Sequence, residues 1–447
     1  MPAPSADWLH DRPQIRTIRA AACDVNGVAR GKRMPIPSAV KMLTGGTRFP
    51  FSALNVDIWG EDIADSPLVF DSGDRDAILF PTERGFVPMP WLEAPTALLP
   101  IWMFHEDGRP YEGDPRHALS FVQKRFAEKG LTPVVAVELE FYLIDDSTRR
   151  LQVPISPRSG KRRDAAEVLS IRALDAFDIF FTDLYEACEV MDIPADTLIS
   201  EAGIGQFEVN LMHQDAMRTA DDAWLFKTLV RGLARRFGFA ATFMAKPMQG
   251  EAGNAMHIHQ SVVDAKTGKN IFSAPDGSET ELFRSFIGGM QHYIPKALVM
   301  MAPYVNSYRR LTPEMAAPVN TAWGYDNRTT AFRIPTSNAA GRRVENRLPS
   351  SDANPYLALA ASLACGYLGM VNGLVPTSPT AETANEGAIS LPRGLLEAVS
   401  LMEAERDFDD ILGREFTATL AGVKRGEFET FMRVISPWER EFLLLNV

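Results

Sequence analysis

The segment VVAVELEFYL, residues Val134–Leu143, carries a period-two pattern of apolar side chains. Successive side chains of a β-strand point to opposite faces, so the apolar positions enter a core. They are Val135, Val137, Leu139, Phe141 and Leu143. Glu138 and Glu140 then lie side by side on the other face. The pattern predicts a strand with two carboxylates on one face, although for this segment alone a solvated outer face is the simpler interpretation.

A second strand is predicted within SEAGIGQFEVNL, residues Ser200–Leu211. Its apolar face contains Phe207 and Val209, and its polar face contains Glu208. Glu201 precedes this strand by a loop with two glycines, which can turn the chain back toward the same face. We therefore expect a second pair of carboxylates near the first.

Two more segments alternate in the same way. AMHIHQSV, residues 255–262, places His257, His259 and Ser261 on one face, which suits a ligand or phosphate site better than a lone histidine would. RVENRL, residues 343–348, places Glu345 between two arginines. Further arginines between residues 306 and 347 are Arg309, Arg310, Arg328 and Arg333.

These strands together supply carboxylates, one imidazole and a group of guanidinium side chains. The candidate metal ligands are Glu138, Glu140, Glu201, Glu208, His257 and Glu345. Hard oxygen ligands suit Mg²⁺ or Mn²⁺, and arginine binds phosphate and carboxylate through a planar fork of donors. Enzymes that transfer phosphoryl groups typically use divalent metal ions together with arginines. A simpler interpretation is that the arginines only neutralise the acidic excess. No P-loop sequence GxxxxGK[ST] is present, so a nucleotide must be held differently.

The chain changes character near residue 112. Earlier residues are rich in Pro and Gly, with strands predicted at Ile15–Val25 and Ala77–Phe80. Asp114 and Pro115 then suit the start of a helix. Later helices are predicted at Ala165–Met191, Asp221–Phe237 and Glu279–Met301. We expect an α+β protein with domains at residues 1–112 and 113–447.

The composition narrows the class of protein. The 447 residues carry a net charge of −11, which argues against nucleic-acid binding. The three cysteines form no CxxC motif, and Met1–Asp11 lacks an apolar signal region, so we expect a cytoplasmic protein. Ala353–Ala381 carries no formal charge but contains prolines. We predict a buried helix over Tyr356–Val371 and no membrane span.

From about residue 130 to 372, the ordered motifs resemble those of the glutamine synthetase family. They are ELE (138–140), EAGIGQFE (201–208), GNAMHIH (253–259), NSYRRL (306–311), NRTTAFRIP (327–335) and RVENR with NPYL (343–347 and 354–357). The resemblance implies a small N-terminal β-grasp-like domain and a catalytic domain with a curved antiparallel sheet and surrounding helices. It also implies a homo-oligomer, commonly a dodecamer of two hexameric rings, with active sites between subunits.

The resemblance also assigns roles by position. Two or three Mg²⁺ or Mn²⁺ ions are implied, one held by Glu140, Glu201 and Glu208 and another by Glu138, His257 and Glu345. The implied glutamate site consists of Gly253, Arg310, Arg328 and Arg347. The implied ATP site consists of His259, Ser261, Arg328 and Arg333. Arg328, at the transferring phosphoryl group, and Arg347 would be the catalytic residues. The implied reaction activates the γ-carboxylate of L-glutamate as γ-glutamyl phosphate, which a nitrogen nucleophile then attacks.

Two departures from the family motifs concern that nucleophile. Members that use ammonia carry a Glu in a GYEAP segment, where this chain has Ala316. They also carry an Asp in an FDGSS segment, whose counterpart here is PFSAL around Ser52. An ammonium site needs carboxylates to hold and deprotonate the cation. Glu314 lies two residues from Ala316, so a shifted loop could still supply that carboxylate.

We therefore expect an organic amine as the acceptor, and the chain resembles the γ-glutamylpolyamine synthetase branch. Acidic residues that follow the altered loop, including Asp57 and Glu61, suit a polyamine such as putrescine or spermidine, although a solvated acidic loop is the simpler interpretation. Trp59 suits an apolar amine, so a monoamine, ethanolamine or an aromatic amine stays open. Glutamine synthetase itself also stays open, whereas the complete set of ligand positions disfavours a non-catalytic relative.

Overall fold

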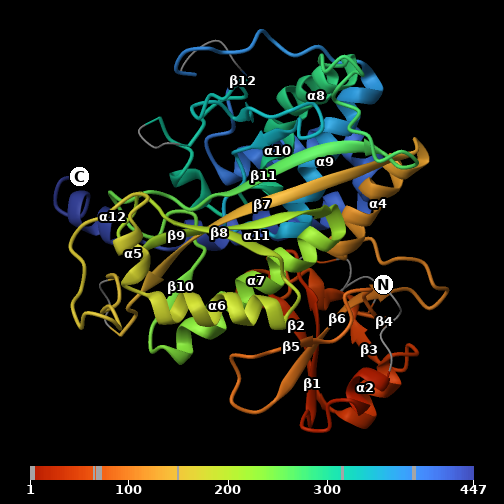
Figure 1. Cartoon of the computed structure of the whole chain (residues 1–447), viewed down its shortest axis with the longest axis vertical. Coiled ribbons are helices and arrows are strands. Elements are labelled where there is room, and N and C mark those ends of the chain that lie inside the picture. The colour runs from red at the N-terminus through yellow and green to blue at the C-terminus, as the bar shows by residue number, and fades with distance from the viewer. Residues whose placement is uncertain (1–5, 64–65, 67–72, 148–150, 314–316, 385–388) are drawn as a thin grey trace.

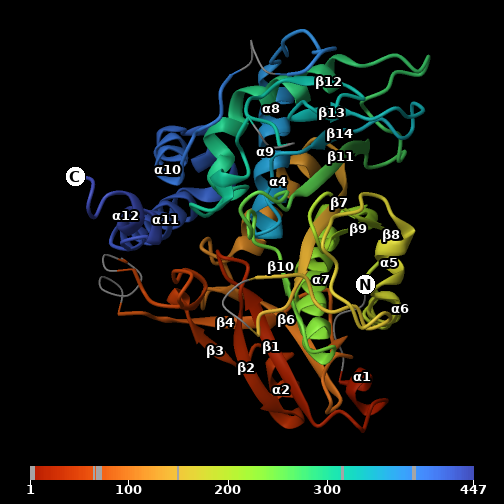
Figure 2. The same ribbon diagram turned by 90° about the vertical axis from the view of Figure 1, so that its left-hand side faces the viewer.

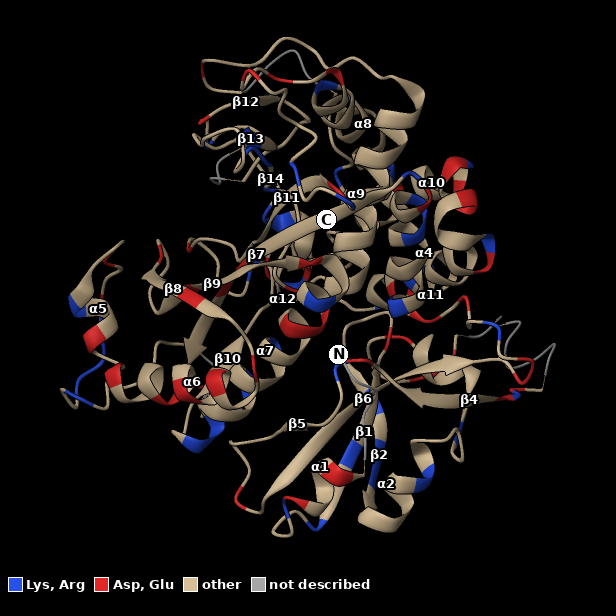
Figure 3. Cartoon of the chain, turned by 45° about the vertical axis from the view of Figure 1, so that its right-hand side comes forward, with Lys and Arg blue, Asp and Glu red and all other residues tan. Residues whose placement is uncertain are grey.

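The structure is a computed structural model of the whole chain and describes residues 6–63, 66, 73–147, 151–313, 317–384 and 389–447. Two β-sheets dominate it, and they lie in different parts of the molecule (Figure 1). The first is built from the N-terminal residues and the second from the middle of the chain. Helices surround the second sheet. Asp and Glu are interspersed with Lys and Arg over both parts (Figure 3).

The first sheet has the strand order β2-β1-β6-β4-β3, with β5 paired to β6. Its strands are β1 Thr17–Cys23, β2 Ala29–Pro35, β3 Arg48–Pro50, β4 Asp76–Pro81, β5 Val87–Pro88 and β6 Thr96–Phe104. β1 and β6 are parallel, and the other pairs are antiparallel. Short helices α1 (Asp7–His10) and α2 (Ile36–Met42) accompany it. The predicted strands at Ile15–Val25 and Ala77–Phe80 correspond to β1 and β4.

The second sheet has the order β12-β13-β14-β11-β7-β9-β8, with β10 paired to β7. Its strands are β7 Leu131–Ile144, β8 Ala195–Ser200, β9 Gln206–Asp215, β10 Ala240–Thr242, β11 Met256–Asp264, β12 Trp323–Tyr325, β13 Phe332–Ile334 and β14 Val344–Asn346. All its pairs are antiparallel except β12 with β13. The expected α+β fold with a largely antiparallel catalytic sheet is confirmed.

Helices pack against this sheet and against one another. The longer described ones are α4 Pro115–Glu128, α6 Asp178–Val190, α7 Ala216–Arg236, α8 Glu281–Ala297, α9 Pro355–Asn372, α10 Leu395–Ala404 and α11 Arg414–Met432. Two shorter ones are α5 Ile171–Asp175 and α12 Pro437–Phe442. Figure 2 shows α7 beside β7 and β9. The alternate apolar side chains of β7 are completely buried beneath these helices, as their spacing predicted.

Local sequence explains where two of these helices begin. Asp114 caps α4 by accepting a hydrogen bond from the backbone N–H of Arg116 at 2.9 Å. Asn354 caps α9 by accepting one from Tyr356. α9 is long and apolar enough to cross a membrane, but 78% of its most apolar window is buried inside the protein. The prediction of a buried core helix is therefore confirmed.

Strand β1 is buried on both faces, and one of these faces joins the N-terminal sheet to the core of the second sheet. Ile18 and Ala20 point into a cluster formed by the N-terminal residues alone. Ala21 and Cys23 point the other way and join the large core beneath the second sheet. We propose domains at residues 1–112 and 113–447, and this shared core would hold them together.

The helix predicted over Ala165–Met191 is shorter than expected. α5 begins only at Ile171, and α6 begins at Asp178 after a break. Leu169 has a φ of 57°, in the left-handed region that a right-handed helix cannot include. Residues 165–170 therefore form an irregular loop, and the apolar periodicity of the sequence extended the predicted helix too far.

Candidate active site

Strand register brings the acidic residues together. β7 lies between β9 and β11, and β14 pairs with the far side of β11. Glu138 is directly opposite His257, and Glu140 is directly opposite Glu208. Directly opposed side chains on one face of an antiparallel pair are about 5 Å apart at Cβ. The four predicted strand faces thus become one surface.

Glu201 reaches this surface from a loop. Its backbone N–H donates to the carbonyl oxygen of Gln206 at 2.9 Å, which closes the turn between β8 and β9. Gly205 in this turn has a φ of 82°, and a Cβ there would lie 2.7 Å from a methyl carbon of Val153. The turn therefore requires glycine, and it places Glu201 beside the strand carboxylates.

Glu140, Glu201 and Glu208 form the first candidate metal group. One carboxylate oxygen from each lies within 4.8 Å of the others. Burial and then the charge of Glu201 raise the pKa of Glu140 to about 8. Burial and then the charge of Glu138 raise the pKa of Glu208 to about 10. The group holds more negative charge than its surroundings neutralise, as expected for ligands of a cation.

Glu138 belongs to two further candidate metal groups, one with His259 and Glu345 and the other with Glu208 and His257. Nδ1 of His257 lies 3.0 Å from one oxygen of Glu138, and Nε2 of His259 lies 2.8 Å from the other. Glu345 lies 3.9 Å from Nδ1 of His257. Burial raises the pKa of Glu138, but the hydrogen bonds from both histidines outweigh it and hold the pKa well below its usual range.

The predicted triad of Glu138, His257 and Glu345 is therefore brought together in space. His259, which the sequence assigned to ATP, also approaches Glu138 closely enough to share a cation with Glu138 and Glu345. Glu345 in turn accepts hydrogen bonds from Arg333 at 2.7 Å and from Arg347 at 2.6 Å. The carboxylates and imidazoles present fit divalent cations such as Mg²⁺ or Mn²⁺.

A cavity of about 490 Å³ opens over these groups. Gly253, Arg310, Arg328, Arg333 and Arg347 line it together with both carboxylate groups. Nε of Arg310 and Nε of Arg347 are buried and have no hydrogen-bond partner among the described residues. A Cβ on Gly253 would lie 2.5 Å from Cγ of Arg310, so only glycine fits beside that guanidinium. Guanidinium groups that line a cavity suit an anionic ligand.

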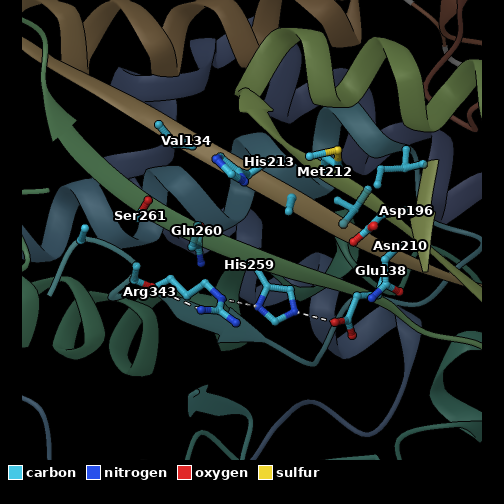
Figure 4. A pocket seen from close by; sticks show the side chains of 15 residues that line it. Val134, Glu138, Asp196, Asn210, Met212, His213, His259, Gln260, Ser261 and Arg343 are labelled. Atoms are coloured by element: carbon cyan, nitrogen blue, oxygen red, sulfur yellow. Dashed lines mark hydrogen bonds and ion pairs between the residues drawn. The ribbon is translucent and has the colours of Figure 1, made fainter. Parts of the chain in front are cut away.

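A second cavity of about 420 Å³ adjoins the first, and Glu138 lines both. It contains His259 and Ser261, two of the residues that the sequence assigned to ATP (Figure 4). Nε of Arg343 donates to Nδ1 of His259 at 3.2 Å. Met212 and His213, at the end of β9, also line this cavity. Sequence reasoning missed both, because only the fold shows that this strand end reaches the cavity.

The four N-terminal candidates for the amine site lie elsewhere. Of the described residues that line either cavity, none comes from the N-terminal 112 residues, so Ser52, Asp57, Trp59 and Glu61 are outside both. Ala316 lies outside the described residues, but the adjacent Ala317 and Pro318 line the larger cavity.

The structure also supplies a carboxylate that the sequence analysis missed. The hydroxyl of Ser52 donates to Oδ2 of Asp74 at 3.1 Å, and its backbone N–H donates to Oδ1 at 3.3 Å. The PFSAL loop therefore has an acid beside it, although its own sequence contains none. Asp74 is 22 residues away, which explains why no local motif revealed it.

Comparisons with known proteins identify the family of this chain. The family described as glutamine synthetase, catalytic domain, matches residues 112–443. A γ-glutamylputrescine synthetase (PuuA) of Escherichia coli is 36% identical over 98% of this chain and 94% of its own length. A glutamate–isopropylamine ligase of a Pseudomonas species is 31% identical over 96% of this chain and 95% of its own.

A further relative and a solved structure extend the similarity. A glutamine synthetase of Pyrococcus horikoshii is 31% identical over 94% of this chain and 90% of its own length. The solved structure of GmaS without ligand superposes with a TM-score of 0.86 at 30% identity, covering 98% of this chain and 99% of that one. The chain therefore belongs to the glutamine synthetase family, whose members are ATP-dependent ligases that form carbon–nitrogen bonds.

Proposed function

We propose that this protein is an ATP-dependent ligase that joins the γ-carboxylate of L-glutamate to an organic amine, with a polyamine such as putrescine or spermidine as the preferred acceptor. One observation carries the proposal: Arg310, Arg328 and Arg347 line the same cavity as two groups of carboxylates. The guanidinium groups offer a site for an anionic substrate, and the carboxylates offer a site for the metals that accompany ATP.

Separate sets of residues would serve each ligand. Glu140, Glu201 and Glu208 would hold one Mg²⁺ or Mn²⁺, and Glu138, His257 and Glu345 would hold another. The bound metals supply charge neutralisation around the phosphates of ATP. Gly253 allows the Arg310 side chain to pack against the backbone at the cavity wall. Arg347 and Arg328 offer positive charge next to the reacting carboxylate and the transferring phosphoryl group. His259, Ser261 and Arg333 would contact ATP.

The reaction would occur in two steps. A γ-carboxylate oxygen of glutamate attacks the γ-phosphorus of ATP, and ADP leaves to give γ-glutamyl phosphate. The amine nitrogen then attacks the carbonyl carbon of the acyl phosphate, phosphate leaves, and the nitrogen loses a proton. Arginines that neutralise the phosphoryl group stabilise charge that develops in both steps. Activation is required because a carboxylate is a poor acyl donor.

Sequence and similarity both support an amine acceptor in place of ammonia. Relatives that cover nearly the whole chain are named for putrescine and for isopropylamine. Ala316 stands where members that use ammonia have a carboxylate. Asp74, however, restores a carboxylate beside Ser52, so ammonium remains the competing acceptor.

An amine panel tests the proposal. Phosphate release is measured with ATP, glutamate and Mg²⁺ or Mn²⁺, and with putrescine, spermidine, butylamine, ethanolamine, an aromatic amine or ammonium. We expect the highest kcat/KM with a diamine or polyamine and release that depends on glutamate. If ammonium gives the highest kcat/KM, the protein is a glutamine synthetase. If no acceptor supports turnover, it is a non-catalytic relative.

We further propose that the protein is cytoplasmic and assembles as a homo-oligomer, a dodecamer of two hexameric rings with active sites between subunits. All three cysteines are buried and unpaired, which suits a reducing compartment. The C-terminal residues lie at the outer edge of the molecule (Figure 2), and Trp438 and Leu445 are largely exposed. Such apolar exposure suits burial against another subunit. Light scattering coupled to size-exclusion chromatography tests the stoichiometry.

A further inference from the structure

The larger cavity has an apolar rim that its charged interior does not explain. Val168 and Leu169 line it and are 58% and 66% exposed. Ile199 of β8 continues this rim, and Ala317 and Pro318 also line the cavity. Two exposed aliphatic side chains at the mouth of a carboxylate- and arginine-lined cavity are unfavourable in water, so they indicate contact with an apolar group.

The backbone holds these two side chains in place. The N–H of Leu169 donates to the carbonyl oxygen of Ser200 at 2.9 Å. The hydroxyl of Ser200 accepts from the N–H of Ser170 at 3.0 Å and donates to the carbonyl of Glu167 at 2.6 Å. Leu169 adopts its φ of 57° despite a branched side chain, for which that conformation is unfavourable. Strained residues that surrounding contacts enforce occur often at ligand sites.

The same hydrogen bonds fix the rim relative to the reaction centre. Ser200 ends β8 and directly precedes Glu201, which belongs to the first carboxylate group. Val168 and Leu169 are therefore tied to the chain segment that supplies a candidate metal ligand. A molecule in the cavity that approaches the carboxylates can lie against this rim with its remaining atoms.

We propose that Val168 and Leu169 form an aliphatic wall against which the carbon chain of the acceptor amine packs, and that this wall selects primary alkylamines and α,ω-diamines. The proposal rests on the glutamate–amine ligase function. An alkyl chain gains by leaving water for this wall. Ammonium has no carbon chain and gains nothing, and ethanolamine would have to place its hydroxyl group against aliphatic carbon.

The test is the double variant Val168→Thr/Leu169→Asn in the full-length protein. Thr has nearly the shape of Val, and Asn has nearly the size of Leu and tolerates positive φ, so the wall becomes polar with little change in backbone. We expect the ratio of kcat/KM for butylamine to that for ammonium to fall about tenfold, since a lost hydrophobic contact changes discrimination by that order. The same ratio for putrescine should fall in parallel.

Ile171→Thr is the matched control. Ile171 is 70% exposed and lies two residues from Leu169, yet it lines neither cavity. We expect it to leave both ratios unchanged. If the double variant misfolds, Leu169→Gly replaces it, because glycine suits the positive φ and also removes the wall.

Two results would overturn the inference in distinguishable ways. If the unaltered protein prefers ammonium to every amine, the proposed function fails, and the wall fails with it. If the unaltered protein prefers amines but the wall variants lower kcat/KM for butylamine and ammonium equally, the function stands and only the wall is wrong.

Discussion

Two acidic groups in this chain differ in how their charge is compensated. Glu140 and Glu208 lie directly opposite each other on two neighbouring strands and are nearly buried. Asp57 and Glu61 belong to one turn of the N-terminal part. Oδ1 of Asp57 accepts the backbone N–H groups of Trp59 and Glu61 at 3.0 and 2.9 Å. The backbone of the turn therefore compensates the charge of Asp57. The carboxylates on the strands, in contrast, have too little positive charge around them.

The difference teaches that acidic density in a sequence does not by itself identify a metal site. Neighbouring acids in a turn stay in water and bond to their own backbone. Acids that strands bring together lose water and repel one another, so they retain protons or require a cation. Substitutions in the two groups, and changes of pH, should therefore have different effects on activity and stability. The largest effect is expected for the strand carboxylates and the smallest for the turn.

Removing one carboxylate from the strand group should have the largest effect. Glu140→Ala removes a buried candidate ligand, and we expect glutamate-dependent phosphate release to fall about a thousandfold or more, because charge on the phosphoryl group is no longer neutralised. Glu186→Ala, which changes an exposed residue of α6, is the control. Full activity of Glu140→Ala at saturating Mg²⁺ would show that Glu140 is not a required metal ligand.

The pH dependence of stability should reveal the same group. The pKa values of Glu140 and Glu208 are raised from 4.5 to about 8 and about 10, so the folded protein retains protons that the unfolded chain loses. These groups therefore make metal-free protein less stable as pH rises above about 4.5. Mn²⁺ binds the deprotonated carboxylates. The gain in Tm on adding Mn²⁺ should be larger at pH 8 than at pH 6. An equal gain at both pH values would contradict the raised pKa values of Glu140 and Glu208.

A carboxylate at position 316 should change the acceptor preference. Ala316→Glu adds an acid next to Ala317, which lines the larger cavity. We expect kcat/KM for ammonium to rise about tenfold relative to that for butylamine, because the new carboxylate can hold a cation and accept its proton. Ala316→Gln has nearly the same size without the charge and is the control. An unchanged ratio would contradict the role of this position.

Neutralising the acidic turn should have the smallest effect. Asp57→Asn with Glu61→Gln keeps a side-chain oxygen at residue 57 to accept the two backbone N–H groups but removes two negative charges. We expect KM for putrescine to rise by about threefold at low salt, which is the order expected for exposed charge pairs. High salt should abolish the difference. Butylamine has no second ammonium group and serves as the control substrate; an equal rise for both amines would show that the turn does not recognise the distal charge.

The sequence alone predicted which side chains share a face of each strand. Period-two alternation placed Glu138 and Glu140 on the polar face of one strand, and the structure puts them there. The buried helix α9 was also predicted from its apolar sequence and its lack of charge. Both predictions depend on local periodicity, which is fixed by backbone geometry. The assignments of individual site residues to metals and substrates remain proposals.

Other features had no local signal. The approach of His259 to Glu138, the carboxylate of Asp74 beside Ser52, and the rim residue Leu169 each depend on segments far apart in the sequence. The helix predicted across residues 165–170 was wrong for a related reason. Hydrogen bonds from the distant Ser200 hold that loop in a conformation that its own apolar pattern does not reveal.

The sequence by itself determined which residue types are available on each strand face and which family they resemble, because side-chain direction follows from a backbone period. Only the tertiary structure decided which faces meet, since strand register and sheet order arise from contacts between distant segments. That register buries Glu140 and Glu208 beside other carboxylates, which raises their pKa values. Hydrogen bonds between distant segments likewise set an aliphatic rim at the mouth of the cavity.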